Sequence, residues 1–316
     1  MTRRPAAAAY WPREPLKAAG AFIDGVFMGV QAPFEAARFL ILPVPFERTT
    51  SYKKGTAKGP DKAIEGSCGV ELWDEETRSQ TYLAGIHTLK PVPVYPNEQA
   101  PTAFPKIEKA VEGWAALKDK TLYSIGGEHS ITQALVPPYA RRHPGLSILH
   151  FDAHADMRES FEGSPHNHAC AAHPLAKLCP LVQVGIRSVA EEEAHYLNAG
   201  NVHTFFAHEH PDVGRLIPQV LDALTDTVYI TIDLDGFDPS VIPGVGTPQP
   251  GGFTWREGLA LFKAVIEAKN VVGVDVMELC PLQDNVISEL AAAKLIYRMM
   301  GYQLAKTSGA RDGSIF

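Results

Sequence analysis

Cysteine is scarce in this sequence, and long apolar runs are absent. The chain of 316 residues has 4 cysteines, which lie far apart in no paired spacing. This argues against a disulfide framework, and we expect reduced, mostly buried thiols in a cytoplasmic protein. No apolar run approaches the roughly 20 residues that a membrane helix needs, and the N-terminus lacks the pattern of a secretory signal. We therefore expect no membrane partner.

Long blocks of like charge are absent as well. The 36 acidic and 29 basic residues give a net charge of −7 that is spread along the chain, so nucleic acid is not an expected partner. With 45% hydrophobic residues the chain can bury a sizeable interior. Residues 1–36 contain proline, alanine and glycine with weak periodicity. We expect them to form an N-terminal extension laid over the surface or used in subunit contact, and residues 37–316 to form a single domain.

Acidic residues and a histidine follow a short apolar run near the middle of the chain. The stretch Ser147–Asp156 begins as a buried strand and then places Asp152, His154 and Asp156 at alternate positions. While the chain stays extended, these three side chains point the same way. Carboxylates gathered on one face repel one another unless a cation lies between them. The pattern indicates a metal site, and a solvated strand end is the alternative for this stretch taken alone.

A second strand pattern repeats this arrangement. Residues 228–232 are mostly β-branched and aromatic, and the alternating Asp233 and Asp235 follow them. If the two strands lie side by side, four carboxylates converge, and two divalent cations would balance their charge. Carboxylates favour manganese or magnesium, whereas imidazole also suits zinc and nickel.

The rest of the sequence alternates strand and helix patterns, which predicts a parallel sheet with helices on both faces. Residues 45–60 form a long loop, and Ser288 is a plausible N-cap for the last helix. The other predicted strands are 38–43, 121–125, 181–186 and 271–278, and the predicted helices are 61–67, 105–118, 191–198, 215–224 and 288–306.

Two further strand ends carry candidate site residues. The strand 121–125 runs into paired glycines, which permit positive φ and a close approach of the backbone, and then into His129. Glu278 ends the last strand, where it could bind metal, transfer protons or pair with a cationic substrate. Six other residues can already ligate two metals: His129, Asp152, His154, Asp156, Asp233 and Asp235. Glu278 is therefore left for the substrate, and a planar guanidinium with its forked donors is the natural match.

Four motifs in order resemble the ureohydrolases, the family that includes arginase, agmatinase, guanidinobutyrase and formiminoglutamase. The resemblance runs from about residue 38 to residue 305, nearly the whole core. The motifs are Gly126–Ser130, Phe151–Asp156, Ile232–Pro239 with Gly246–Pro248 and Gly251–Gly252, and Asp275–Glu278.

The resemblance implies a three-layer α/β/α fold around a mostly parallel eight-stranded sheet, and release of urea from a guanidino compound. It implies two Mn²⁺ per chain, with Ni²⁺ or Zn²⁺ as alternatives, and a homo-oligomer that is a trimer or a hexamer. It also implies the division of the ligands. His129, Asp152, Asp156 and Asp233 would serve one metal, and Asp152, His154, Asp233 and Asp235 would serve the other.

Guanidinium hydrolysis needs a strong nucleophile because the guanidinium carbon is a poor electrophile. Two metals about 3.5–4 Å apart can lower the pKa of a bridging water, which Asp235 can orient or deprotonate. The leaving amine needs a proton. His166 and His168 lie in a short histidine-containing loop and are candidates to bind substrate at the mouth of the site. His168 matches the mouth histidine of the family best and is the expected proton shuttle.

The substrate is harder to predict. His166 stands where arginases hold the α-carboxylate of arginine, which disfavours arginase, and Glu128 and Ser130 disfavour formiminoglutamase. The chain looks more like bacterial agmatinases, although these commonly carry Glu where Gln249 stands. We expect hydrolysis of agmatine to putrescine and urea, with 4-guanidinobutyrate or guanidine as the alternative substrate. A metal-dependent deacetylase on a related fold and a non-catalytic metal scaffold are alternatives from other classes.

Overall fold

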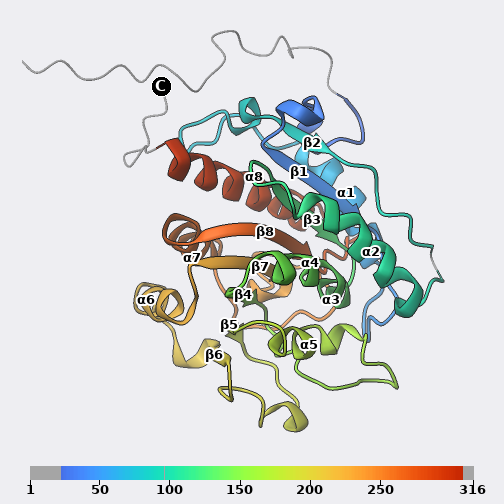
Figure 1. Ribbon diagram of the computed structural model, residues 1–316, viewed down its shortest axis with the longest axis vertical. Helices are drawn as coiled ribbons and strands as arrows, with labels where there is room; N and C mark the ends of the chain where they lie inside the picture. Colours follow the sequence, from blue (N-terminus) through green and yellow to red (C-terminus); the bar gives the residue numbers. More distant parts are fainter. Residues whose placement is uncertain (1–22, 96, 309–316) are drawn as a thin grey trace, which may run out of the picture.

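Eight parallel strands form one sheet in the computed structural model, which describes residues 23–95 and 97–308 (Figure 1). Their order across the sheet is β2-β1-β3-β8-β7-β4-β5-β6, and every neighbouring pair is parallel. All carboxyl ends therefore lie at the same edge. The strands are β1 Phe39–Val44, β2 Ile86–Thr88, β3 Thr121–Gly126, β4 Leu146–Phe151, β5 Leu181–Ile186, β6 Val202–Phe206, β7 Thr227–Asp233 and β8 Asn270–Met277.

Helices cover both faces of this sheet, so the predicted three-layer α/β/α fold is confirmed (Figure 1). One layer holds α1 Gly59–Ser67, α6 Val213–Ala223, α7 Trp255–Ala268 and α8 Ile287–Ser308, and the other holds α2 Ala100–Trp114, α3 Thr132–Leu135, α4 Pro137–Arg142 and α5 Ala172–Ala176. Because both faces are covered, β1, β3, β4 and β5 are buried along their whole length. No helix in the described ranges is long and apolar enough to span a membrane.

The two strands at the edges of the sheet, β2 and β6, escaped prediction from the sequence. β2 has 3 residues, and β6 has an alternating, partly exposed burial pattern that includes the exposed His203. An edge strand pairs on one side and meets solvent, so it needs no continuous apolar run. The six central strands do carry such runs, and they occur within a residue or so of their predicted positions.

Several predicted helix boundaries need correction. The helix expected at 105–118 begins at Ala100 and ends at Trp114, so its proline at position 105 lies inside the helix. The helix expected at 191–198 is only a 3₁₀ turn at Glu191–Glu193. Ser288 is not an N-cap, because it lies inside α8 and accepts a hydrogen bond from the amide of Gly244 at 2.7 Å.

The predicted N-terminal extension lies partly outside the described residues, which begin at residue 23. Its last third packs against the domain, where the Phe27 side chain is fully buried. The amide of Phe27 donates to Thr88 Oγ1 at 2.9 Å, and that of Met28 donates to Ser67 Oγ at 2.7 Å. This part of the segment therefore joins the edge of the core beside β2.

Candidate metal centre

The topology brings the predicted ligands to one place. β4 and β7 are neighbours, with Phe151 opposite Ile232, so Asp152 just after β4 and Asp233 at the end of β7 lie at adjacent strand ends. β8 and β3 continue the sheet on the other side of β7 and deliver Glu278 and His129 to the same edge. Sheets of this kind bind ligands outside the carboxyl ends of their strands.

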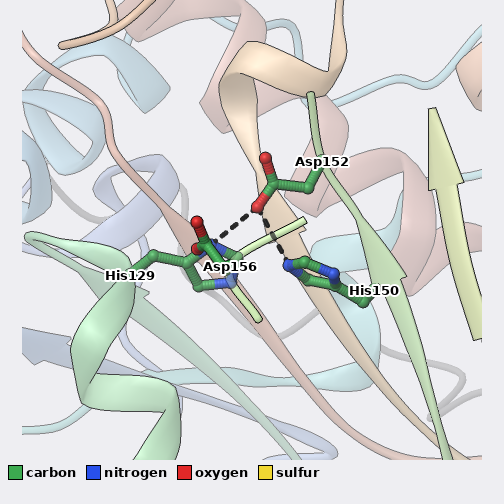
Figure 2. Close-up of side chains that lie close together, drawn as sticks. All are labelled: His129, His150, Asp152 and Asp156. Atoms are coloured by element: carbon green, nitrogen blue, oxygen red, sulfur yellow. Dashed lines mark ion pairs between the residues drawn. The ribbon is translucent and has the colours of Figure 1, made fainter. Parts of the chain in front are cut away.

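One part of the cluster surrounds His129, as Figure 2 shows in part. His129 Nδ1 lies 3.0 Å from Asp152 Oδ2, 3.3 Å from Asp233 Oδ2 and 3.6 Å from Asp156 Oδ2. All four residues are buried. We call His129, Asp156 and Asp233 the inner half of the centre.

The other part surrounds His154, nearer the solvent. His154 Nδ1 lies 3.0 Å from Asp235 Oδ2 and 3.6 Å from Asp152 Oδ1, and the His154 side chain is 22% exposed. We call His154 and Asp235 the outer half. Asp152 faces both halves, because one of its oxygens lies near each histidine. The structure thus brings together all six residues that the sequence predicted as ligands.

Backbone amides orient three of the carboxylates. His154 N donates to Asp152 Oδ1 at 2.6 Å, and Asp235 N donates to Asp233 Oδ1 at 2.9 Å. Ala153 N donates to Asp235 Oδ1 at 3.2 Å. In each case Oδ1 is held by the main chain and Oδ2 faces the cluster, and Asp152 Oδ1 also lies near His154. The carboxylates are therefore positioned before any ligand binds.

The clustered carboxylates strongly favour positive charge between them. Burial lowers the pKa of His154, but Asp235 and Asp152 outweigh it and raise the pKa to about 12. For His129 burial acts downward too, and Asp152 and Asp233 hold its pKa well above the usual value. Burial and neighbouring carboxylates raise the pKa of Asp156 and Asp233 well above normal. Metal binding must displace these protons.

The donor set fits divalent metal ions. His129 Nδ1 and Asp152 Oδ2 are buried, lie 3.0 Å apart and have no hydrogen-bond partner among the described residues, as expected for atoms that face a common ion. Oxygen and imidazole donors in this mixture suit manganese, and nickel and zinc also accept such ligands.

His150 is a buried neighbour of the cluster that the sequence analysis did not identify. Its Nε2 lies 2.9 Å from Asp152 Oδ2 (Figure 2). The amide of Gln183 donates to the Ala155 carbonyl at 2.7 Å and faces His150 Nδ1 at 3.0 Å. Nδ1 must therefore accept, which leaves the proton on Nε2 and makes His150 a poor metal ligand. Its position two residues before Asp152, on the same face of the strand, was the available signal.

Glu278 lies beside the cluster, as the sequence predicted. It adopts φ 64°, a left-handed conformation that is unusual for a non-glycine residue. The amide of His129 donates to Glu278 Oε1 at 2.7 Å. His168 Nδ1 lies 3.7 Å from the same oxygen, and His168 Nε2 lies 3.1 Å from Ser51 Oγ. The predicted substrate carboxylate and the predicted proton shuttle are therefore neighbours.

His166 is not brought to this site. Its Nδ1 contacts Gln133 Oε1 at 3.0 Å, and its ring packs edge-on against Phe104 with centroids 5.2 Å apart. It lines a separate surface depression, whereas His168 lines the cavity that contains His154 and Asp156. The expected contact between His166 and substrate has no geometric support in this arrangement. The physical reason is that the chain turns between the two histidines, so they face different cavities.

The loop 45–60 closes one side of the site and is tied to it by a buried glutamate. Glu128 accepts hydrogen bonds from the amide of Thr49 at 2.5 Å and from the Thr49 hydroxyl at 2.7 Å. The amide of His168 in turn donates to Thr49 Oγ1 at 2.9 Å. The paired glycines before Glu128 serve close packing, since a Cβ on Gly127 would lie 1.9 Å from the Phe46 carbonyl oxygen. Neither of these glycines has positive φ, contrary to one of the two reasons considered from the sequence.

The resulting cavity has a volume of about 160 Å³ and is bounded on one side by His154, Asp156 and Asp233 and on another by Ser51 and His168. A parallel α/β sheet whose carboxyl edge gathers histidines and aspartates beside a further glutamate is an arrangement that suits metal-dependent hydrolysis.

The chain belongs to the arginase family, whose model matches residues 37–301. It is a hydrolase of that binuclear, metal-dependent family. N(1)-aminopropylagmatine ureohydrolase from Synechocystis sp. is 39% identical over 272 residues, which cover 84% of this chain and 89% of that protein. Agmatinase from Bacillus cereus is 33% identical over 291 residues, which cover 89% of this chain and 97% of that protein.

Solved structures agree with this placement. Agmatine ureohydrolase of Thermoplasma volcanium superposes with a TM-score of 0.78 at 28% identity and covers 88% of this chain and 94% of its own. Arginase from Bacillus caldovelox has a TM-score of 0.72 at 24% identity and covers 84% of this chain and 98% of its own. At that identity the second comparison shows the fold alone, and it supports the predicted arginase-like architecture.

Proposed function

We propose that this enzyme hydrolyses agmatine to putrescine and urea and that it uses two manganese ions. The observation that carries the proposal is the position of Glu278, a carboxylate beside the candidate metal centre with Oε1 held by the amide of His129 at 2.7 Å. A fixed carboxylate in a buried site can form paired, charge-assisted hydrogen bonds with a planar guanidinium. Those bonds would place the guanidinium carbon next to the cluster.

The side chains divide the remaining work. His129, Asp152, Asp156 and Asp233 would hold one ion, and Asp152, His154, Asp233 and Asp235 would hold the other. When bound, the ions supply a water that is nucleophilic at neutral pH.

Asp235 orients the attacking water, since its Oδ1 is fixed by the amide of Ala153 and its Oδ2 faces the cluster. His168 lines the cavity with Nδ1 3.7 Å from Glu278 Oε1, where it gives a proton to the departing amine.

N(1)-aminopropylagmatine is the second candidate substrate. The relative that is 39% identical over 84% of this chain bears its name. Agmatine and its aminopropyl derivative share the guanidinium that Glu278 would bind and differ in the cationic tail, so the residues at the sheet edge do not separate them. 4-Guanidinobutyrate and guanidine share the same reacting group and remain as comparison substrates.

Urea release from a panel of guanidino compounds tests the proposal. Metal-free enzyme would be loaded with manganese, nickel or zinc and assayed with agmatine, N(1)-aminopropylagmatine, 4-guanidinobutyrate, arginine and guanidine. The highest kcat/KM is expected for agmatine with manganese. A higher value for the aminopropyl derivative would reassign the substrate within the family, and a higher value with nickel would reassign the metal. No urea from any compound would contradict the proposal.

Two further properties belong to the same proposal. We infer a cytoplasmic enzyme from the absence of paired cysteine spacings. We also infer a homo-oligomer, a trimer or hexamer, as the sequence resemblance implies. Sedimentation of the purified protein, giving a monomer at micromolar concentration, would contradict the second of these inferences.

A further inference from the structure

A fully buried carboxylate lies behind the histidine of the inner half. Asp275 has no exposed surface and sits on β8 directly opposite Thr231 of β7. It belongs neither to the proposed ligands nor to the proposed substrate contact. A buried carboxylate is costly unless hydrogen bonds satisfy it, so its partners indicate what it does.

Three hydroxyl groups donate to Asp275. Tyr229 Oη and Thr132 Oγ1 donate to Oδ2 at 2.9 and 3.2 Å, and Thr231 Oγ1 donates to Oδ1 at 2.6 Å. Three donated hydrogen bonds stabilise the ionised carboxylate of Asp275 and oppose the burial that raises its pKa to about 6. The single hydroxyl proton of Thr231 is therefore committed to Asp275.

The direction of the Thr231 hydroxyl proton determines the hydrogen bond between Thr231 and His129. His129 Nε2 lies 2.8 Å from Thr231 Oγ1. Since the proton of Thr231 points to Asp275, its oxygen can only accept, and Nε2 must carry the proton. His129 Nδ1, which lies 3.0 Å from Asp152 Oδ2, then offers its lone pair to the cluster. A hydrogen bond to the distal nitrogen commonly fixes the tautomer of a metal-binding histidine.

We propose that Asp275, acting through Thr231, is a positioning residue that selects the metal-binding tautomer of His129. The proposal rests on the ligand role given to His129 under the proposed function. It extends that role to a residue on another strand that touches neither metal nor substrate. Because Thr231 and Asp275 are partners in the register of β7 and β8, the sheet itself holds this hydrogen bond in place.

Asp275→Asn is the direct test. The amide can donate to Thr231 Oγ1, which would turn the threonine proton toward His129 Nε2 and move the imidazole proton to Nδ1. Titration of the metal-free variant with Mn²⁺ should show about 10–100-fold weaker binding at one of two sites. In alkaline buffer, ¹H–¹⁵N spectra of the ring nitrogens should show His129 as the Nδ1–H tautomer, in contrast to Nε2–H in the parent protein.

A matched pair at Thr231 makes the test independent of how Asp275→Asn folds. Thr231→Val removes the hydroxyl at nearly constant shape, and Thr231→Ser keeps it. Manganese affinity should fall about 10-fold or more in the valine variant and stay within about twofold of the parent in the serine variant. Tyr229→Phe serves as the control, because it removes one donor from Asp275 and leaves the path through Thr231 intact.

Equal manganese affinities in the valine and serine variants would overturn the proposal, as would retention of the Nε2–H tautomer in Asp275→Asn. A purely structural role would lower the thermal stability of the metal-free variants without separating valine from serine in metal affinity. Neither readout uses a guanidino substrate. A wrong substrate assignment therefore leaves this result intact, and lost urea release alone does not support it.

Discussion

The inner and outer halves of the candidate metal centre contain the same kinds of side chain in different surroundings. His129 has a 1% exposed side chain, and its distal nitrogen meets a buried threonine at 2.8 Å. His154 is 22% exposed, and its distal nitrogen lies 3.4 Å from the amide nitrogen of Gln249, a longer and weaker contact.

This difference indicates that the two halves of one cluster would bind their metal ions with different strength. The contact behind His129 is fully buried, which would favour tight binding of an ion in the inner half. Residues of both halves line the cavity, but the outer half depends on His154, which is partly exposed and more loosely supported. We therefore expect the outer ion to leave first when a chelator is added, with loss of urea release before loss of the second ion.

The largest expected effect in the outer half comes from Asp235→Asn. Removing this charge weakens the outer ion and the orientation of the nucleophile together, so kcat should fall by about 10⁴-fold. Metal analysis of the same variant should show that the inner ion is retained. Near-normal kcat with both ions bound would show that the outer half does not depend on Asp235 for metal binding or for orienting the nucleophile.

Glu278→Gln should have the next largest effect and should spare both halves. Each charge-assisted hydrogen bond to a guanidinium contributes about 1.5–3 kcal/mol, so kcat/KM should fall by about 10³-fold. Misplacement of the guanidinium should lower kcat as well as raise KM. Both ions should remain by metal analysis, and loss of one would show that Glu278 is a ligand. Full activity on agmatine would mean that the guanidinium is held elsewhere.

His168→Asn should lower kcat by about 10²-fold. Burial lowers the pKa of His168, but Glu278 and Asp156 outweigh it and raise the pKa to about 9. The protonated form is therefore present at neutral pH and is lost as pH rises, which predicts an alkaline decline of kcat/KM. Bound cations would bring that decline below pH 9.

The pH profile of the His168→Asn variant supplies the control. The alkaline decline should disappear, and added imidazole should restore part of kcat. An unchanged rate and an unchanged profile would make His168 an ordinary loop histidine at the cavity mouth.

Gln249→Glu should have the smallest effect. It should make metal binding in the outer half more similar in strength to that in the inner half. A carboxylate at this position would accept a hydrogen bond from a protonated His154 Nε2, which the amide nitrogen of Gln249 that now faces it cannot do. Affinity for the outer ion should rise by up to about tenfold, measured by titration with Mn²⁺. Gln249→Met is the matched control without a polar group. Equal affinities in the two variants would show that this contact does not tune the outer ion.

Much of the site could be predicted because its signals are local. Asp152, His154 and Asp156 alternate within one segment, which marked them as candidate ligands. The expected extended backbone does not reach Asp156, however, because β4 ends at Phe151 and Asp156 adopts φ 52°. The apolar run before each ligand marked the strand and its carboxyl end. The edge strands lacked such runs and were missed. The residues around the 3₁₀ turn at Glu191–Glu193 have a pattern that predicted a longer helix.

The sequence by itself determined which side chains could bind metal and that they would end strands of a parallel sheet. Only the tertiary structure decided which groups support them. His150 meets Gln183 across β4 and β5, and Thr231 meets Asp275 across β7 and β8, because strands distant in sequence lie in register. It also decided that His168 faces the cavity while His166, two residues earlier, faces away. The alternation of side chains along a strand can be read within a single segment. Strand order and the neighbours of each side chain are fixed only when the whole sheet packs.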